Sequence, residues 1–449
     1  MNGRTTELNK NIVKGGLTAV TFALFLCAET AAAPRSLDLW VCPAGGYEEE
    51  EAVSALARDY EEANPSVGVN VRILDEETGT DEITGVLGTE NAPDLVISSP
   101  EDIVTTWGGS GYMEDLGSLW DEETLREIDP EVREACVSRD GIYYQMPVFR
   151  DVYTMAINYE SFSETATLQY LNEDVHSWKD SGFIDCVLVL HDYIFLHEDR
   201  ELTVARIPRL KGRDVRYFMS FITNLSNGSL ISDTRNSYTV SSKAVRNSFA
   251  ILKKLKGKGI VFDKKAGSEE ELAQFLSGEL PVTFFWSWYR HQKYAQSTDF
   301  TVFPMMYPNS KNLPVLSGDI CGFGVVKGED EQAVADSLDF VRFITEDPEE
   351  YRKAVAASSC FPVRTSVKGQ RVEGIYPEGE DAQLFRSFSE FFKDYVPTMP
   401  LFDDLEAEWP ELVRQIGAGA GIKDLTQAID EKLNKKLEEE YGIVENIVG

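Results

Sequence analysis

The sequence predicts an α/β protein with an all-helical C-terminal tail. Three observations predict it: the chain opens as strand, helix and strand from residue 37, strand and helix patterns alternate through its middle, and residues 404–440 are charged and helical in pattern. Two parallel strands need a helical crossover, so the opening order indicates a parallel sheet covered by helices. A length of 449 residues suits two large lobes.

The opening unit is defined by periodicity. Residues 37–41, LDLWV, form a short apolar strand. Residues 48–62 then place Val53, Leu56 and Tyr60 at helical spacing, and an Asn-Pro pair ends this helix. Residues 67–73 alternate apolar and polar side chains, which is the period of a strand.

Later elements follow the same logic. Ser242 and Gly257 are predicted to cap the helix between them, and Asp347, Pro348 and Glu350 start another helix as its N-cap, first and third residues. Strands are predicted at 94–97, 143–148, 154–157 and 282–285, and helices at 243–256 and 331–345.

Residues 163–215 fit no simple pattern. They contain an apolar run, Cys186 to Leu196, and then a basic patch. In an acidic chain we interpret this patch as a solvated face, and contact with a partner is the alternative. The patch comprises Arg206, Arg209, Lys211, Arg213 and Arg216.

Residues 1–33 have the pattern of a secretory signal peptide, which predicts an exported, extracellular or periplasmic protein. Basic residues precede an uncharged, mostly apolar stretch from Gly15 to Ala28, and three alanines follow at 31–33. This stretch is short for a membrane span. Cys27 has two interpretations: an acylated cysteine that anchors the protein to the membrane surface, or an ordinary leader cysteine removed by cleavage near Ala33.

Composition and motifs exclude several functions. The formal charge of −33, from 76 acidic and 43 basic residues, argues against nucleic acid and anionic lipid. The four histidines lack zinc-site spacing, and GxSxG, Walker A and GxGxxG motifs are absent, so we expect no metal, no cofactor and no catalytic residues. Carboxylates are too abundant to nominate an acid–base pair. The five cysteines after the leader are expected to be isolated, mostly buried thiols.

One segment suggests binding without reaction. Trp286 and Trp288 follow the buried strand 282–285, and side chains at the carboxyl end of such a strand project into the crevice of an α/β sheet. Flat aromatic rings beside carboxylates and amides suit a pyranose. We therefore expect at least one of these tryptophans to face a ligand, with burial in the core as the alternative.

Five ordered blocks resemble those of extracellular solute-binding proteins of the carbohydrate type, the cluster that includes maltose-binding protein. The resemblance covers nearly all of residues 37–440 and departs from the family at Glu160, where Lys is usual, and at Pro281-Val282, where Ala-Met is usual. The blocks are LDLWV with NPSVGVNVRIL, NAPDLVISSPEDI, GIYYQMPVFRDVYTMAINYESF, FLSGELPVTFFWSWY, and SGDICGFGVVKG with SSCFPVRTSV.

The resemblance implies positions for the ligand contacts. Asp151 stands where a carboxylate meets sugar hydroxyls, and Trp288 aligns with a stacking tryptophan. Cys42 and Ala44 replace residues that are often polar, and the Arg150-Asp151 pair is also compatible with a charged ligand. The implied ligand-binding set is Pro43, Gly45, Tyr47, Ser98, Glu101, Asp151, Trp286, Trp288, Gly318 and Asp319.

The resemblance also implies a periplasmic-binding-protein-like fold with two α/β lobes joined by a hinge. Residues 36–148 and 288–346 are expected in lobe 1, and residues 149–287 and 347–449 in lobe 2. A monomer would close around a sugar or oligosaccharide and deliver it to the membrane subunits of an ABC transporter. The alternatives are another solute in the same fold, such as a peptide, a polyol phosphate or an amino-sugar derivative, and a secreted glycosidase.

Overall fold

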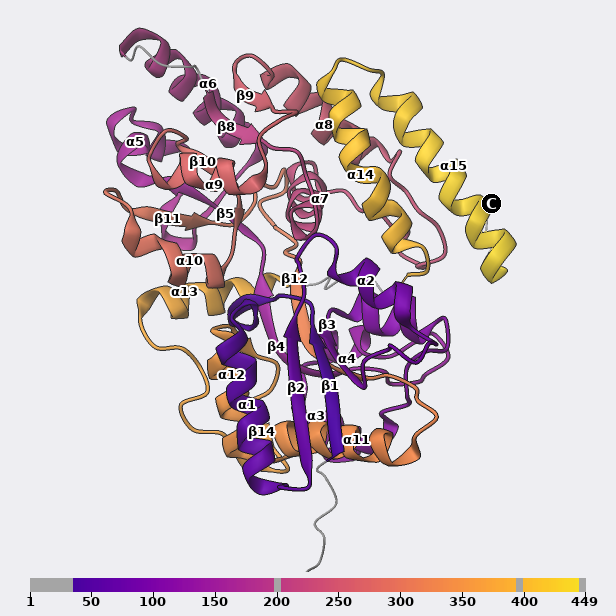
Figure 1. Cartoon of the computed structure of the whole chain (residues 1–449). Coiled ribbons are helices and arrows are strands. Elements are labelled where there is room, and N and C mark those ends of the chain that lie inside the picture. The colour runs from indigo at the N-terminus through magenta and orange to yellow at the C-terminus, as the bar shows by residue number, and fades with distance from the viewer. Residues whose placement is uncertain (1–34, 198–202, 393–398, 444–449) are drawn as a thin grey trace, which may run out of the picture.

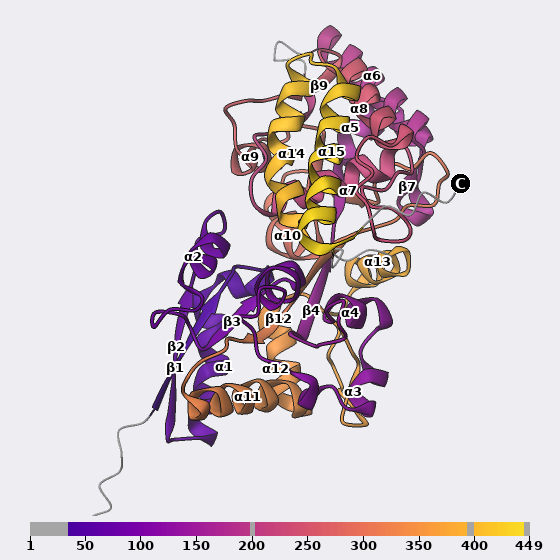
Figure 2. The same cartoon turned by 90° about the vertical axis from the view of Figure 1, so that its right-hand side faces the viewer.

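The chain folds into two lobes joined by extended segments, as the computed structural model in Figures 1 and 2 shows. The structure describes residues 35–197, 203–392 and 399–443. The predicted signal peptide and Cys27 lie outside the described residues. Among the residues that are described, no helix combines the length and apolar character needed to span a membrane.

The first lobe, lower in Figure 1, is built on a six-stranded sheet of order β13-β4-β12-β3-β1-β2. β1 is parallel to β2 and β3, whereas β12 runs antiparallel between β3 and β4. The strands are β1 (Arg35–Val41), β2 (Val67–Ile73), β3 (Leu95–Ser98), β4 (Met146–Val152), β12 (Gly318–Val325) and β13 (Phe361–Pro362).

Both faces of this sheet are covered. Leu95 and Ile97 point into the main core of the protein, and Val96 points into a smaller core around Ile83 and Trp107. The central strands are therefore continuously apolar, as a doubly covered sheet requires. The covering segments are α1 (Glu50–Ala63), α2 (Gly79–Val86), α3 (Glu122–Glu127), α4 (Pro130–Ala135), α11 (Glu331–Glu346), α12 (Pro348–Ser358) and the helical segments η1 (Gly45–Glu48) and η2 (Glu101–Gly108).

The second lobe contains an antiparallel sheet of order β10-β5-β11 and a parallel pair, β8 and β9. The C-terminal helices α14 and α15 lie side by side on this lobe (Figure 2). Its strands are β5 (Thr154–Asn158), β8 (Thr203–Ile207), β9 (Gly259–Phe262), β10 (Val282–Trp286) and β11 (Val302–Met305). Its helices are α5 (Tyr159–Glu164), α6 (Asp180–His197), α7 (Arg213–Leu225), α8 (Lys243–Leu255), α9 (Ser268–Leu276), α10 (Trp288–Tyr294), α14 (Phe402–Gly417) and α15 (Ile422–Tyr441).

The smaller elements lie at the edges of the lobes. Two short hairpins are β6 (Leu171–Asn172) with β7 (Ser177–Trp178), and β14 (Ser366–Val367) with β15 (Gln370–Arg371). α13 (Glu380–Phe388) lies between the lobes in both views (Figures 1 and 2). The short helical turns are η3 (Gly117–Leu119), η4 (Thr167–Tyr170), η5 (Glu173–Val175), η6 (Ala295–Ser297) and η7 (Ser389–Phe391).

The predicted helix caps are confirmed. The Ser242 side chain accepts a hydrogen bond from the Val245 backbone at the start of α8. The Asp347 side chain accepts from the backbones of Glu349 and Glu350 at the start of α12. These caps depend on local chemistry alone, which explains why the sequence reveals them.

Two predicted elements differ from the structure. The strand predicted at 143–148 begins at Met146 and continues through Pro147 to Val152. Pro147 lacks a backbone donor, and the register with β12 shifts at Gly322, its partner. The tail is two helices, because the segment Ala418–Gly421 interrupts it.

The predicted lobe boundaries also need correction. β11 pairs with β5 in the second lobe, so the chain returns to the first lobe between Met305 and Gly318, later than residue 288. β13 pairs with β4, and α12 packs against α1, so residues 348–362 belong to the first lobe. Strand patterns show that a strand exists but do not show which sheet it joins.

Candidate functional site

The candidate site is the cleft between the lobes, which contains two adjoining cavities of about 660 and 710 Å³. The carboxyl ends of β1, β2 and β3 reach this cleft from the first lobe, together with the start of β12. The segment before α7 reaches it from the second lobe. Ligands bind at this edge of α/β sheets. The walls shared by both cavities are Ala44, Asp75, Glu76, Glu77, Lys211, Gly212, Arg213 and Asp319.

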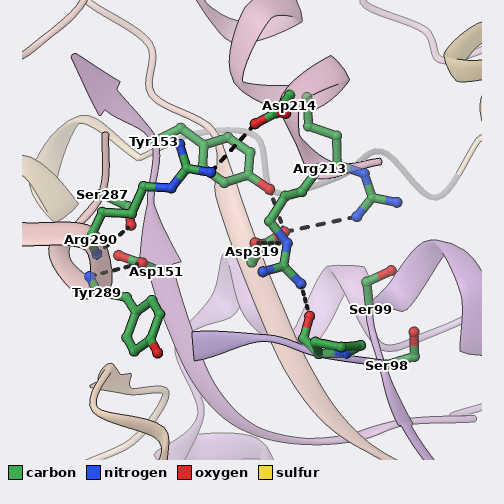
Figure 3. Close-up of polar contacts among 12 residues, drawn as sticks. Ser98, Ser99, Asp151, Tyr153, Arg213, Asp214, Ser287, Tyr289, Arg290 and Asp319 are labelled. Atoms are coloured by element: carbon green, nitrogen blue, oxygen red, sulfur yellow. Dashed lines mark hydrogen bonds and ion pairs between the residues drawn. The ribbon is translucent and has the colours of Figure 1, made fainter. Parts of the chain in front are cut away.

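Arg213 and Asp319 form the centre of the cleft (Figure 3). The Arg213 Nε lies 2.9 Å from an Asp319 carboxylate oxygen, and the same guanidinium donates to the backbone carbonyl of Pro43. The hydroxyl of Tyr153 also donates to Asp319. Arg213 of the second lobe therefore contacts the first lobe at two places, the loop after β1 and the start of β12.

Arg216, one helical turn further along α7, joins three carboxylates. Its guanidinium is 2.6 Å from Glu406 on α14, 3.3 Å from Glu101 and 3.8 Å from Asp319. Burial raises the pKa of Glu101, and the nearby Arg216 opposes that shift. Glu101 does not line either cleft cavity among the described residues, and its carboxylate faces Arg216 instead.

Asp151 lines the 710 Å³ cavity at the end of β4. Its carboxylate accepts hydrogen bonds from the backbones of Trp288 and Tyr289, at 3.0 and 3.2 Å, and so caps the start of α10. Burial raises its pKa to about 6. Asp151 lies where the chain first crosses between the lobes, from β4 to β5, and it ties this crossing to α10 of the second lobe as well as facing the cavity.

The two tryptophans are not ligand-facing in this structure, contrary to the prediction. Trp286 is fully buried, and its ring centroid lies 5.6 Å from that of Phe275. Trp288 is 4% exposed and packs between Phe361 and Phe385, at centroid distances of 5.3 and 5.4 Å. Neither lines a cleft cavity among the described residues. Trp288 opens α10, and the first turn of this helix directs it into the core.

The aromatic residue that reaches the cleft from this segment is the next one, Tyr289. Successive helix positions differ by about 100°, so the neighbour of an inward side chain can point outward. The Tyr289 hydroxyl donates to Glu48 across the cleft at 2.7 Å. The sequence-based prediction included Trp286 and Trp288 and did not include Tyr289. The rings that line the 710 Å³ cavity are Phe149, Tyr217, Tyr289 and Tyr294.

The other predicted residues divide into three groups. Pro43, Gly45, Ser98 and Asp319 line the cleft cavities. Gly318 lines a separate cavity of about 240 Å³ beside the segment between β11 and β12. Tyr47 is buried in the first lobe, and its hydroxyl donates to the carbonyl of Ala354. Its aromatic ring therefore serves the core instead of a ligand.

Most of the basic patch is not a solvated face, although Arg209 is exposed at the edge of the 710 Å³ cavity. Lys211, Arg213 and Arg216 form part of the cleft wall, and Arg206 pairs with Asp263 inside the second lobe. The sequence contained one signal of this role: the cations cluster around Gly212, at the start of α7. Without the fold, nothing showed that this helix begins at the cleft.

Carboxylates dominate the 660 Å³ cavity. Asp102 from the first lobe accepts from Ser99 at 3.2 Å and from Ser98, while Asp403 from α14 accepts from Thr106 across the cleft. Burial and the charge of nearby Asp102 raise the pKa of Asp403 to about 7. This compartment is rich in hydrogen-bond acceptors for a solute that carries hydroxyl or amino groups.

Within the described parts of the chain, no group of three or more His, Cys, Asp or Glu side chains is placed to hold a metal ion. The five described cysteines are free thiols, and four of them are buried, as predicted.

The family of bacterial extracellular solute-binding proteins matches residues 55–373. The chain belongs to this family. The predicted membership of the extracellular solute-binding proteins and the two-lobed fold are thereby confirmed.

Solved structures share the fold of this solute-binding protein at low identity. The GacH receptor of Streptomyces glaucescens, studied with acarbose, has a TM-score of 0.72 and 14% identity over 91% of this chain and 99% of its own. UgpB from Mycobacterium tuberculosis, in complex with glycerophosphocholine, has a TM-score of 0.71 and 15% identity over 91% and 100%.

A third similar structure is the maltose/maltodextrin-binding domain MalE from Bdellovibrio bacteriovorus bound to maltotriose. It has a TM-score of 0.69 and 12% identity over 89% of this chain and all of its own. No curated protein sequence matches this solute-binding protein.

Proposed function

We propose that this solute-binding protein captures a sugar or short oligosaccharide between its lobes by hinge closure. The observation that carries the proposal is the cavity in which the partly exposed rings of Tyr289 and Tyr294 share the wall with Asp151 and Asp319. Aromatic faces pack on the C–H face of a sugar ring, and carboxylates accept hydrogen bonds from its hydroxyls. Such charge-assisted bonds contribute about 1.5–3 kcal/mol each.

The similar structures support both a sugar and a different solute. Acarbose and maltotriose are the ligands of two of them, and glycerophosphocholine is the ligand of a third. The charges of the cleft favour the sugar, because most of its cations already contact carboxylates and are less available to a phosphate. The pairs are Lys211–Glu77, Arg213–Asp319, Arg216–Glu406, Arg290–Asp214 and Lys293–Glu48.

The proposed cellular role is delivery of the solute to the membrane subunits of an ABC transporter by an exported monomer. Cys27 is a candidate lipid anchor, and cleavage near residue 33 is the alternative. Mass spectrometry of the mature N-terminus distinguishes the two. We propose binding without turnover, so hydrolysis of any glycan in a panel would instead favour the glycosidase alternative.

A thermal-shift screen against a carbohydrate library tests the proposed function, since a solute bound only by the folded protein raises its Tm. We expect one or more neutral sugars to raise the Tm, and calorimetry to show binding of one molecule per chain. If no sugar stabilises the protein while glycerophosphodiesters, sugar phosphates or peptides do, the carbohydrate proposal fails.

Asp319→Asn locates the bound solute. The substitution removes the charge that Arg213 and Tyr153 contact, and we expect the affinity for the identified sugar to fall about tenfold or more, equivalent to about 1.4 kcal/mol. The matched control is Asp233→Asn, because Asp233 is exposed in a turn of the second lobe. Equal affinities of the two variants would place the solute away from Asp319.

A further inference from the structure

The lobes are connected across the cleft by the protein's own charged side chains. Lys211, just before α7, pairs with Glu77 after β2. Lys293 on α10 pairs with Glu48 on η1. Each pair has one partner in each lobe, so both must break when the cleft opens.

The two rims differ in charge. The first-lobe rim is acidic, with Glu48, Asp75, Glu76, Glu77 and Asp81. The second-lobe rim carries the cations, interspersed with the carboxylates of Asp214, Glu269, Glu270, Asp403 and Glu406. Those cations are Arg209, Lys211, Arg213, Arg216, Arg290 and Lys293. In a chain of formal charge −33, the cations that face first-lobe carboxylates directly, as in the Lys211–Glu77 and Lys293–Glu48 pairs, produce local attraction at the cleft where the average surface repels.

We propose that these cross-cleft ion pairs hold the cleft closed without solute, so that ionic strength sets the closed fraction of the protein. This inference rests on the proposed clamp function and adds its regulation. Because solute binds the closed state, its apparent affinity follows the closed fraction. Salt therefore weakens binding even of an uncharged sugar, whose own contacts salt hardly affects.

The exposure of the pairs makes them sensitive to salt. The side chains of Lys211 and Glu77 are 38% and 50% exposed, and those of Lys293 and Glu48 are 34% and 35% exposed. Such solvent-exposed pairs are individually weak, and added salt weakens them further. We expect the ratio of closed to open protein to fall about threefold or more between low and high salt.

Three more ion pairs cross the cleft: Arg213–Asp319, Arg216–Glu101 and Arg216–Asp319. Their side chains are at most 25% exposed, so salt screens them much less than the two exposed pairs. Two hydrogen bonds also cross the cleft. Tyr289 donates to Glu48, and the Gln292 side chain donates to the carbonyl of Ser359. Asp102 and Asp403 oppose closure as like charges. A pH of about 8.5 lies above the pKa of Asp403, so its charge stays nearly constant while salt is varied.

Small-angle X-ray scattering of the ligand-free protein at pH 8.5 tests the inference. We expect the radius of gyration to increase between 20 mM and 500 mM NaCl as the cleft opens. The double variant Glu48→Gln and Glu77→Gln keeps hydrogen-bond acceptors but loses both charges. It should be expanded at low salt and nearly insensitive to salt. The matched control, Glu62→Gln with Glu90→Gln, changes two exposed first-lobe glutamates away from the cleft.

A wild-type radius of gyration that is constant across this range overturns the inference, and this measurement requires no variant to fold. An equal response of the cleft and control variants overturns it as well. Neither result affects the carbohydrate screen, which tests solute capture separately. Conversely, if the protein opens with salt but binds no sugar, the proposal that ion pairs control the hinge stands and the proposal of a sugar ligand fails.

Discussion

Glu271 shows at the scale of one residue how burial alters a charge. It lies on α9 with 1% of its surface exposed, and Thr283 donates to its carboxyl group at 3.2 Å. Burial raises its pKa from an ordinary value near 4.5 to about 8. The folded protein therefore holds a proton here that the unfolded chain releases, and this group costs stability as the pH rises from about 4.5 to 8.

Glu271→Gln removes this titration while keeping the shape of the side chain. We expect the variant and the wild type to differ little at pH 5, and the variant to become more stable by about 2–4 kcal/mol at pH 8.5. Urea unfolding of both proteins at the two pH values measures the difference. A stability difference that does not change with pH would contradict the prediction.

Trp288 is the residue for which burial and ligand stacking make different predictions. Because its ring packs between Phe361 and Phe385, we expect Trp288→Ala to lower the free energy of unfolding by about 3–5 kcal/mol. Phe195→Ala is the control, since Phe195 is 65% exposed and should change stability by less than about 0.5 kcal/mol. A stable Trp288→Ala protein with reduced sugar affinity would restore the stacking role.

At the scale of the element, α12 shows how a local cap supports the sheet beneath it. Asp347 caps the helix, which places Tyr351 against the sheet, where its hydroxyl donates to the carbonyl of Val148 on β4 at 2.9 Å. β4 continues to Asp151, which caps α10 in the other lobe. The capped helix α12 thus supports β4 through Tyr351, and Asp151 at the end of β4 connects that strand to α10 in the second lobe.

Asp347→Ala should lower the free energy of unfolding by about 1 kcal/mol, because the backbones of Glu349 and Glu350 lose their acceptor. Asp347→Asn keeps an acceptor and should cost less than half as much. Denaturant titrations of the three proteins provide the comparison. Equal losses for Ala and Asn would show that charge near the helix dipole, and not the hydrogen bond, is the stabilising feature.

At the scale of the whole molecule, the excess of carboxylates lowers the stability of the folded state but helps to close the cleft. A formal charge of −33 makes the folded protein repel itself, whereas charges of opposite sign face each other across the cleft. Salt screens both effects. It therefore favours the folded state overall while it weakens closure.

The Tm of the ligand-free protein should accordingly rise when NaCl is increased from 20 to 500 mM, because screening relieves the repulsion within the folded state. Differential scanning calorimetry at pH 8.5 measures this change, and potassium chloride serves as a control for ion-specific effects. A falling Tm would mean that the ion pairs outweigh the general repulsion.

The sequence by itself determined the α/β class, most helices and strands, two helix caps and the resemblance to carbohydrate-type binding proteins. These features depend on periodicity and on chemistry among neighbouring residues, as at Ser242 and Asp347. It also placed Pro43, Ser98, Asp151 and Asp319 at the cleft by the order of family blocks.

Only the tertiary structure decided which lobe β11 and β13 join, that Trp288 is in the core, and that Arg213 reaches Pro43 and Asp319. The physical reason is that the cleft is formed by side chains from segments more than a hundred residues apart. Their distances and burial depend on packing, which no local pattern encodes.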